Sequence, residues 1–223
     1  MTQPGNWYPA LPAQSLPAAG AVLAASVHGQ DLALWRSASG SVQAWEDRCP
    51  HRGVALSLGR VLGDRLACAY HGWEYAAGDG RCVAIPAMPQ QPVPGKVCVK
   101  TFAAAECQGM VWVAPGATPP RDAPPVAATD TAPHFLRSMA IAAPWATVEA
   151  ALADPLGFTP AGPCQWRGHW AGHGGLLLWT LDAAAHWCLL HVASAAPPPQ
   201  TELPSLFGAL RLLRERLHSA ADT

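Results

Sequence analysis

The sequence predicts an α+β protein, in which an all-β N-terminal part precedes a smaller part that combines an antiparallel sheet with a C-terminal helix. Two observations support this fold class. Between residues 20 and 113, short runs of β-type residues alternate with turn signals, which is typical of a compact meander of strands. After residue 134, a short helical segment, three strand-like runs and an amphipathic helix follow one another.

The N-terminal strands are expected at residues 21–27, 32–36, 42–45 and 109–113. The apolar stretch 16–27 is interpreted as the first strand, because Pro17 and Gly20 interrupt it and no basic flank precedes it, as a signal peptide would require. The following segment, 115–133, is rich in Pro, Ala and Thr, which indicates a linker or an exposed crossing segment. The predicted organisation is therefore a first domain over residues 1–115, a linker over 116–134 and a second domain over 135–223.

The second part is predicted to contain two helices and three strands. A helix over 145–153 begins after Pro144 and ends before Pro155. Strands are expected over 165–171, 176–181 and 186–194. The helix over 205–219 carries one apolar stripe, formed by Leu206, Phe207, Leu210, Leu213 and Leu217.

Composition excludes several classes of function. The net charge of −1 and the 13% of charged residues leave no basic stripe for a nucleic acid. No apolar run reaches the roughly 18 residues of a membrane span, so we expect a cytoplasmic protein. In a reducing compartment, five of the seven cysteines are expected as thiols rather than disulfides, namely Cys82, Cys98, Cys107, Cys164 and Cys188.

The remaining two cysteines belong to the most informative motif, Cys49-Pro50-His51, sixteen residues, then Cys68-Ala69-Tyr70-His71. Two short Cys/His pairs on separate loops can close on one metal centre from two sides. A [2Fe–2S] cluster with one Cys₂ iron and one His₂ iron suits this pattern. A structural zinc ion also suits it, so the spacing by itself leaves both interpretations open.

Flanking residues extend the motif to Cys49-Pro50-His51-Arg52-Gly53, Leu56-Ser57, Gly59, Cys68-Ala69-Tyr70-His71-Gly72-Trp73-Glu74-Tyr75 and Gly80-Arg81-Cys82-Val83-Ala84-Ile85-Pro86. This run resembles the Rieske domain of Rieske-type non-haem iron oxygenases, and Trp73 is typical of the oxygenase branch. The resemblance disfavours zinc and implies one [2Fe–2S] cluster, with Cys49 and Cys68 on one iron and His51 and His71 on the other. It also implies that the two histidines are the exit contacts for electrons.

In the same family, a second domain of helix-grip type holds a mononuclear Fe(II) through two histidines and one carboxylate. The helix that carries this signature is matched here by Trp145, Val148-Glu149-Ala150 and Asp154. Gly157 and Gly162 stand where the resemblance places the two histidines, and glycine has no side chain to bind iron. We therefore expect a reduced helix-grip-like domain with no mononuclear Fe(II) and no catalytic residue.

Other histidines of the second part do not replace the two missing ligands. Positions four apart in a strand lie about 13 Å from each other, so His169 and His173 cannot share one ion. His186 and His191, with the four tryptophans Trp166, Trp170, Trp179 and Trp187, are interpreted as packing residues. Asp154 has two interpretations that stay open. It can end a helix, or it can form the contact implied by the resemblance, across a subunit boundary to a neighbour's cluster histidine.

Three functions follow from these expectations. The first is an electron-transfer or structural subunit of a multicomponent Rieske oxygenase, in a trimer-like hetero-oligomer with a full-length catalytic subunit. In that assembly His71 would meet the partner's aspartate, and an NAD(P)H-dependent flavin and ferredoxin-type reductase would supply electrons. The second is a self-sufficient hydroxylase or demethylase with an unrecognised iron site. The third is a free-standing Rieske electron carrier.

Overall fold

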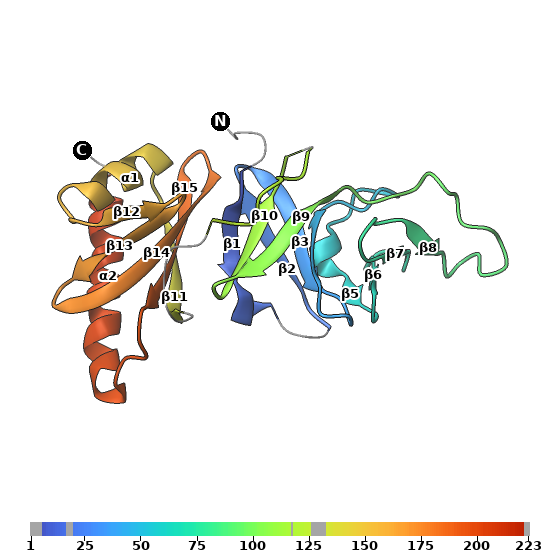
Figure 1. Cartoon of the computed structure of the whole chain (residues 1–223). Coiled ribbons are helices and arrows are strands. Elements are labelled where there is room, and N and C mark those ends of the chain that lie inside the picture. The colour runs from blue at the N-terminus through green and yellow to red at the C-terminus, as the bar shows by residue number, and fades with distance from the viewer. Residues whose placement is uncertain (1–5, 17–19, 117, 126–132, 221–223) are drawn as a thin grey trace. The chain divides into compact units, whose positions relative to one another are not determined.

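The computed structural model of the chain describes residues 6–16, 20–116, 118–125 and 133–220, and it has the predicted α+β composition (Figure 1). The chain divides into two compact units. The first comprises Met1–Glu106 and Val111–Ala123, and the second comprises Cys107–Met110 and Pro124–Thr223. No helix among the described residues is both long and apolar enough to cross a membrane.

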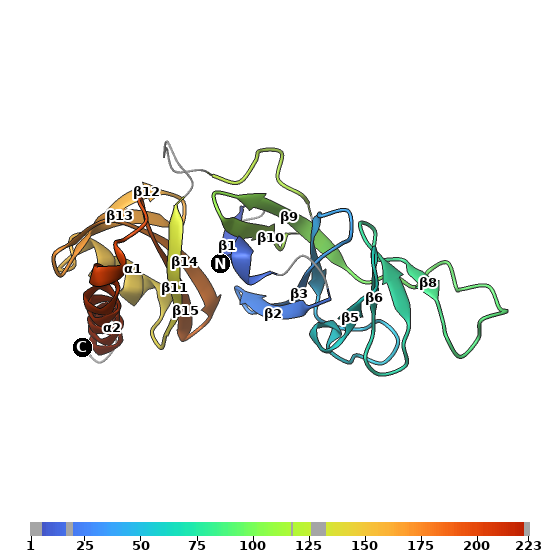
Figure 2. The same ribbon diagram turned by 90° about the horizontal axis from the view of Figure 1, so that it is seen from below.

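The first unit is built on a six-stranded antiparallel sheet with the strand order β1-β10-β9-β4-β3-β2. In chain order these strands are β1 (Tyr8–Pro12), β2 (Val22–Val27), β3 (Gln30–Arg36), β4 (Val42–Glu46), β9 (Thr101–Cys107) and β10 (Met110–Ala114). The residues between β4 and β9 form a second, four-stranded sheet of short strands, which are β5 (Arg60–Val61), β6 (Arg65–Ala67), β7 (Glu74–Ala76) and β8 (Cys82–Ala84). Figure 2 shows β5 and β6 beside the end of β3.

One apolar cluster joins the two sheets. Trp35 and Trp45 pack edge to face, with ring centroids 4.9 Å apart, and both are fully buried. Leu56, Leu66 and Tyr75 from the small-sheet region are fully buried in the same cluster. This packing fixes the loops of the small sheet against the end of β4.

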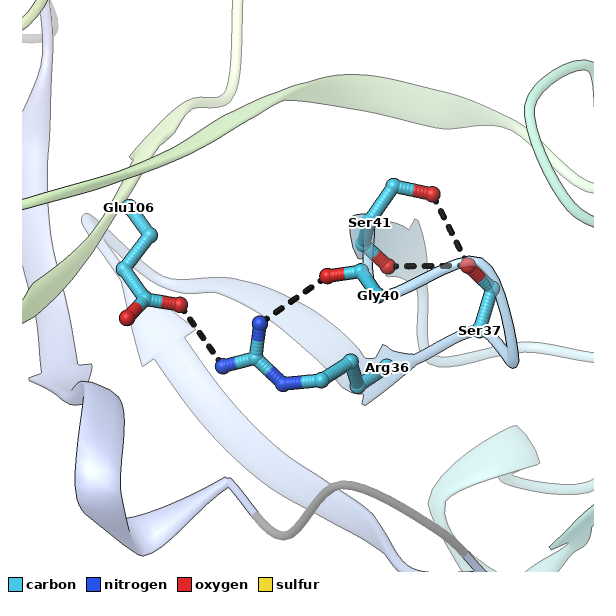
Figure 3. Close-up of polar contacts among 5 residues, drawn as sticks. All are labelled: Arg36, Ser37, Gly40, Ser41 and Glu106. Carbon is cyan, nitrogen blue, oxygen red and sulfur yellow. Dashed lines mark hydrogen bonds and ion pairs between the residues drawn. The ribbon is translucent and has the colours of Figure 1, made fainter.

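Side-chain hydrogen bonds and one ion pair stabilise the β3–β4 hairpin (Figure 3). The Arg36 guanidinium donates to the Gly40 carbonyl at 3.0 Å and pairs with the Glu106 carboxylate of β9 at 2.7 Å. The hydroxyls of Ser37 and Ser41 lie 2.8 Å apart. These contacts set the direction of β4, which leads directly into the Cys49 loop.

The second unit contains a five-stranded antiparallel sheet with the order β11-β15-β14-β13-β12. Its strands are β11 (His134–Ile141), β12 (Thr159–Gly162), β13 (Gln165–Trp170), β14 (His173–Ala184) and β15 (Trp187–Ser194). Helices α1 (Trp145–Ala153) and α2 (Leu203–Ser219) pack on this sheet (Figure 1). Four leucines of the α2 stripe are buried in the core, namely Leu206, Leu210, Leu213 and Leu217.

Several local predictions are confirmed, and others are wrong. The helix over 145–153 is confirmed, and α2 begins two residues earlier than expected, at Leu203. The prediction of one strand over 16–27 is wrong, since β2 begins at Val22. Strand β11 begins at His134, inside the segment assigned to the linker. Of that linker, residues 117 and 126–132 lie outside the described residues.

Candidate metal centre

The Cys49 loop is a closed turn held by two backbone hydrogen bonds. The Cys49 N–H donates to the Val54 carbonyl at 2.8 Å, and the Gly53 N–H donates to the Cys49 carbonyl at 2.8 Å. Gly53 has a φ of 75°, in the left-handed region that glycine adopts without steric cost. The Asp47 carboxylate, at the start of the loop, accepts the N–H and the hydroxyl of Ser57, both at 2.6 Å.

The Cys68 loop repeats the same scaffold. The Cys68 N–H donates to the Trp73 carbonyl at 2.9 Å, and the Gly72 N–H donates to the Cys68 carbonyl at 3.1 Å. Gly72 has a φ of 70°. Each cysteine is thus followed four residues later by a left-handed glycine that closes its loop. This shared spacing is a local signal that links the two halves of the motif.

The two loops bring the histidines together. The Nδ1 atoms of His51 and His71 lie 3.2 Å apart, and their ring centroids lie 4.8 Å apart. Trp73 stacks on His51 with a centroid separation of 4.1 Å and an interplanar angle of 8°, while Tyr70 covers His71 at 3.8 Å. His71 is exposed and His51 is half-buried. These aromatic neighbours of the histidines were not predicted, because stacking depends on how the loops are placed.

The two cysteines lie deeper than the histidines. Cys49 is 3% exposed and Cys68 is 2% exposed. Burial raises the pKa of the Cys68 thiol, and the neighbouring Cys49 adds to the shift. The hydroxyl of Tyr75, which is fully buried, lies 3.1 Å from the Cys49 Sγ. Burial, and then the hydrogen bond to Cys49, raise the pKa of Tyr75, so the phenol keeps its proton and donates it toward the sulfur.

This donor set fits a two-iron group. Buried thiols form an inner pair and imidazoles form an outer pair, as a cluster with one Cys₂ iron and one His₂ iron requires. Partial burial, His71 and Arg52 lower the pKa of His51, which favours the neutral imidazole that binds metals. Among the described residues, no three His, Cys, Asp or Glu side chains converge on a single ion. The cysteines and the histidines thus form two separate pairs of side chains, and not one group around a single ion.

A cavity of about 410 Å³ lies beside the Cys49 loop. Its walls come from the loop after β4 and from the segment that precedes β9. Its lining residues include three cations, Arg48, Arg52 and Lys100, and one carboxylate, Glu46. The cavity also reaches Cys49 and His51, so a cationic surface lies directly against the candidate centre.

The other predicted residues lie in the second unit, apart from this motif in the chain. Asp154 is exposed and follows α1, and its N–H donates to the Ala150 carbonyl at 2.9 Å. Gly157 and Gly162 are exposed, with positive φ values of 71° and 153°. His191 is buried, and its Nδ1 lies 2.7 Å from the hydroxyl of Ser138.

His173 is half-buried and lines a smaller cavity of about 280 Å³, together with Glu202 of the 3₁₀ turn before α2. The other wall residues of this cavity are mainly glycine, alanine and proline. His169 lies in β13 and His173 in β14, so the predicted spacing of the two along one strand is wrong, because a turn separates them. His169 is exposed, with its ring against the backbone of Gly174. His186 and Trp187, at the turn between β14 and β15, are exposed, whereas Trp166 and Trp179 are buried.

Comparison with known proteins agrees with the motif. The family model for the Rieske [2Fe-2S] domain matches residues 6–103. Oxidoreductase NdmD of Pseudomonas putida is 44% identical over 114 residues, which are 51% of this chain and 19% of that protein. The 3-chlorobenzoate-3,4-dioxygenase oxygenase subunit of Comamonas testosteroni is 40% identical over 108 residues, which are 48% of this chain and 25% of that protein. The chain therefore matches only a fifth to a quarter of the length of these relatives.

Solved structures extend the likeness to the second unit. Apo dicamba monooxygenase has a TM-score of 0.75 at 20% identity, over 99% of this chain and 86% of that chain. The QL mutant of NdmA from Pseudomonas putida CBB5, solved with theobromine, has a TM-score of 0.72 at 21% identity, over 95% and 80%. At this identity the comparison shows the fold alone. Together, these matches confirm the resemblance that the motif predicted.

Proposed function

We propose that this chain, which contains a Rieske [2Fe-2S] domain and has the fold of the Rieske oxygenases, is the electron-transfer subunit of a multicomponent oxygenase. It would receive electrons from a reductase and pass them to the mononuclear iron of a partner catalytic subunit. The proposal rests on a contrast between the two units of the chain. The two-loop donor set is complete, whereas glycines occupy both predicted histidine positions of the second iron site.

The proposed cluster ligands are Cys49 and Cys68 on one iron and His51 and His71 on the other. When bound, the cluster supplies one-electron transfer. The burial of the two cysteines and the exposure of His71 support this assignment, because they leave the imidazole pair nearer the surface. The scaffold of repeated backbone hydrogen bonds supports it further, because it closes both loops in the same way and turns each Cys/His pair toward the other.

The packing of the second unit supports the absence of a local mononuclear iron. Between its sheet and helices lies an apolar core that includes Leu152, Leu178 and Leu190. Phe158, directly after Gly157, is 2% exposed and belongs to this core. A carboxylate–histidine iron site would need polar donors within such a space. Asp154 is then proposed to contact a neighbour's centre, and His71 to contact the partner's aspartate.

The proposed partners are a full-length oxygenase catalytic subunit and an NAD(P)H-dependent flavin and ferredoxin-type reductase, in the cytoplasm. Two of the relatives support a multicomponent assembly, since each is named as the oxygenase subunit of a larger enzyme, the chlorobenzoate dioxygenase and a vanillate O-demethylase. The aromatic side chain of Tyr70, 61% exposed and covering His71, supports a protein contact at that histidine.

The test is metal analysis with EPR on the anaerobically purified chain, alone and co-expressed with any full-length Rieske oxygenase that a neighbouring gene encodes. We expect two irons per chain, a Rieske-type signal after reduction, and substrate turnover only in the co-expressed complex. The Cys68→Ser variant is the control, and it should lose the signal in both preparations. A third iron with turnover by the isolated chain would overturn the proposal.

The whole-chain likeness to dicamba monooxygenase favours one alternative, a terminal oxygenase that builds its iron site from other residues. The same experiment separates the two functions, because a terminal oxygenase needs a third iron and no catalytic partner. A chain that exchanges electrons with a reductase but supports no oxygenase would instead be a free-standing carrier.

A further inference from the structure

We propose that the cationic cavity, defined by Arg48, Arg52 and Lys100 beside His51, is the docking site for an acidic surface of the electron-donating protein. This inference rests on the proposed function and deepens it, because it assigns electron uptake to the His51 side of the centre. The release of electrons to a catalytic partner stays on the His71 side.

The charge of the cavity differs from that of the chain. Its three cations are exposed, and against its single carboxylate, Glu46, they give a local charge of about +2. The whole chain carries a net charge of −1. A local excess of one sign focuses the electric field and raises the encounter rate with an oppositely charged partner.

The three cations of the cavity are not neutralised by an ion pair within the described residues. The ion pairs given for the described residues use Arg36, Arg65, Arg81 and Arg211, and none of them uses a cation of the cavity.

Two side-chain contacts and one backbone hydrogen bond position the two segments that line the cavity. The Lys100 ammonium lies 4.9 Å from the centre of the Phe102 ring. The Arg48 side chain lies over Gly53. The Nε of Arg48 is 3.5 Å from the position that a Cβ atom would take at this glycine. The Glu46 N–H donates to the Lys100 carbonyl at 2.8 Å, which joins the two walls of the cavity. Two of the three cations, Arg48 and Lys100, therefore have a defined contact within the chain.

The kind of surface indicates a transient partner. Permanent interfaces between subunits are large and apolar, whereas redox encounters are small and steered by charge. Four of the ten residues that line the cationic cavity are charged, and its branched aliphatic side chain, Val99, is buried. The opposite histidine carries the exposed ring of Tyr70, a surface suited to a lasting contact. A donor that must bind, deliver and leave therefore fits the His51 side.

The redox step is a single electron transfer. A reduced iron–sulfur carrier protein docks with its carboxylates against the three cations and is oxidised by one electron, while the Rieske domain is reduced by one electron. No bond forms or breaks, and no group is transferred. Cys49 and His51, two of the proposed cluster ligands, both line the cavity, so a donor docked there lies directly against the centre.

The test uses the anaerobically purified full chain and, as the probe, a reduced acidic [2Fe–2S] ferredoxin of the plant type, in stopped-flow mixing at several salt concentrations. In the charge-reversed double variant Arg48→Glu/Lys100→Glu, we expect the second-order rate at low salt to fall at least about tenfold. The difference from the wild type should shrink as salt rises. The control double variant Arg214→Glu/Arg216→Glu, at two exposed positions of α2 with no ion pair given, changes the net charge by the same amount and should change the rate less than about twofold.

A second probe separates docking from damage to the centre. The cationic acceptor hexaammineruthenium(III) should oxidise the reduced double variant faster than the reduced wild type, because the local charge has changed sign. If both probes react more slowly, or if Arg214→Glu/Arg216→Glu has the same effect as Arg48→Glu/Lys100→Glu, the docking site is refuted. Iron content and the EPR signal of each variant, measured after equilibrium reduction, report the cluster itself. Loss of these in the wild type would instead refute the proposed function.

Discussion

The hydroxyl of Tyr75 lies 3.1 Å from the Sγ of Cys49, although the two residues are 26 positions apart in the chain. Both side chains are buried, Tyr75 completely. A buried phenol that keeps its proton donates a hydrogen bond to the sulfur, and such bonds raise the reduction potential of an iron–sulfur cluster because they stabilise the reduced, more negative state.

We therefore expect Tyr75→Phe to lower the reduction potential of the Rieske centre. One net hydrogen bond of about 1 kcal/mol corresponds to about 40 mV for one electron. The measurement is a redox titration followed by EPR or circular dichroism. Tyr70→Phe is the control, because the Tyr70 side chain is exposed and the structure gives its hydroxyl no bond to sulfur. An unchanged potential in Tyr75→Phe would show that the contact does not persist in the cluster-bound protein.

The parallel stack of Trp73 on His51 should matter for retention of the cluster. In Trp73→Ala, the imidazole loses an aromatic contact of about 1 kcal/mol, so His51 becomes more mobile. We expect faster iron release to a chelator and a broader EPR signal, both partly restored in Trp73→Phe. Trp187→Ala, which removes a ring that is 50% exposed in the second unit, provides the reference rate. Equal release rates for Trp73→Ala and Trp187→Ala would contradict a role for the stack.

The two left-handed glycines should be the least replaceable positions of the loops. Gly53→Ala and Gly72→Ala place a Cβ on residues with φ of 75° and 70°, which costs about 1–2 kcal/mol of folding stability each. At Gly72, the added Cβ would also lie 3.2 Å from the Cγ of Pro86. The measurement is thermal unfolding of the iron-loaded chain. Gly95→Ala is the neutral control, since its φ is ordinary and nothing lies within 4 Å.

Cys164 offers a test of pH dependence outside the centre. Burial, with a smaller effect of the Glu149 carboxylate, raises the pKa of Cys164 to about 11. Because the thiolate is the reactive form, only about one thiol in a thousand is ionised at pH 8, and alkylation should accelerate about tenfold per pH unit up to that pKa. Labelling with iodoacetamide, quantified by mass spectrometry, should modify the exposed Cys98 long before Cys164.

The Glu149→Gln variant tests the cause of this shift. Removing the carboxylate charge should lower the pKa of Cys164 and speed its alkylation slightly at any pH below 11. A rate for Cys164 that is already independent of pH between 8 and 10 would mean that its thiol ionises in the ordinary range.

The sequence by itself determined the features that depend on local order along the chain. The two Cys/His pairs and the residues that flank them predict the centre, because each pair occupies one closed turn whose geometry is set within six residues. Helix α1 follows in the same way from Pro144 at its start and Pro155 just beyond its end. The stripe of leucines identifies α2, because a helix repeats every 3.6 residues whatever its partner.

Only the tertiary structure decided the features that join distant segments. Strands β5 to β8 have two or three residues each, too few to show any period, and they form because neighbouring strands pair with them. The stack of Trp73 on His51, the hydrogen bond from Tyr75 to Cys49 and the grouping of Arg48 with Lys100 all cross between loops. No pattern along the chain encodes such contacts, since they depend on the packing of two sheets around a shared core. The sequence thus determined which residues we propose as iron ligands, and the tertiary structure decided which side chains surround them.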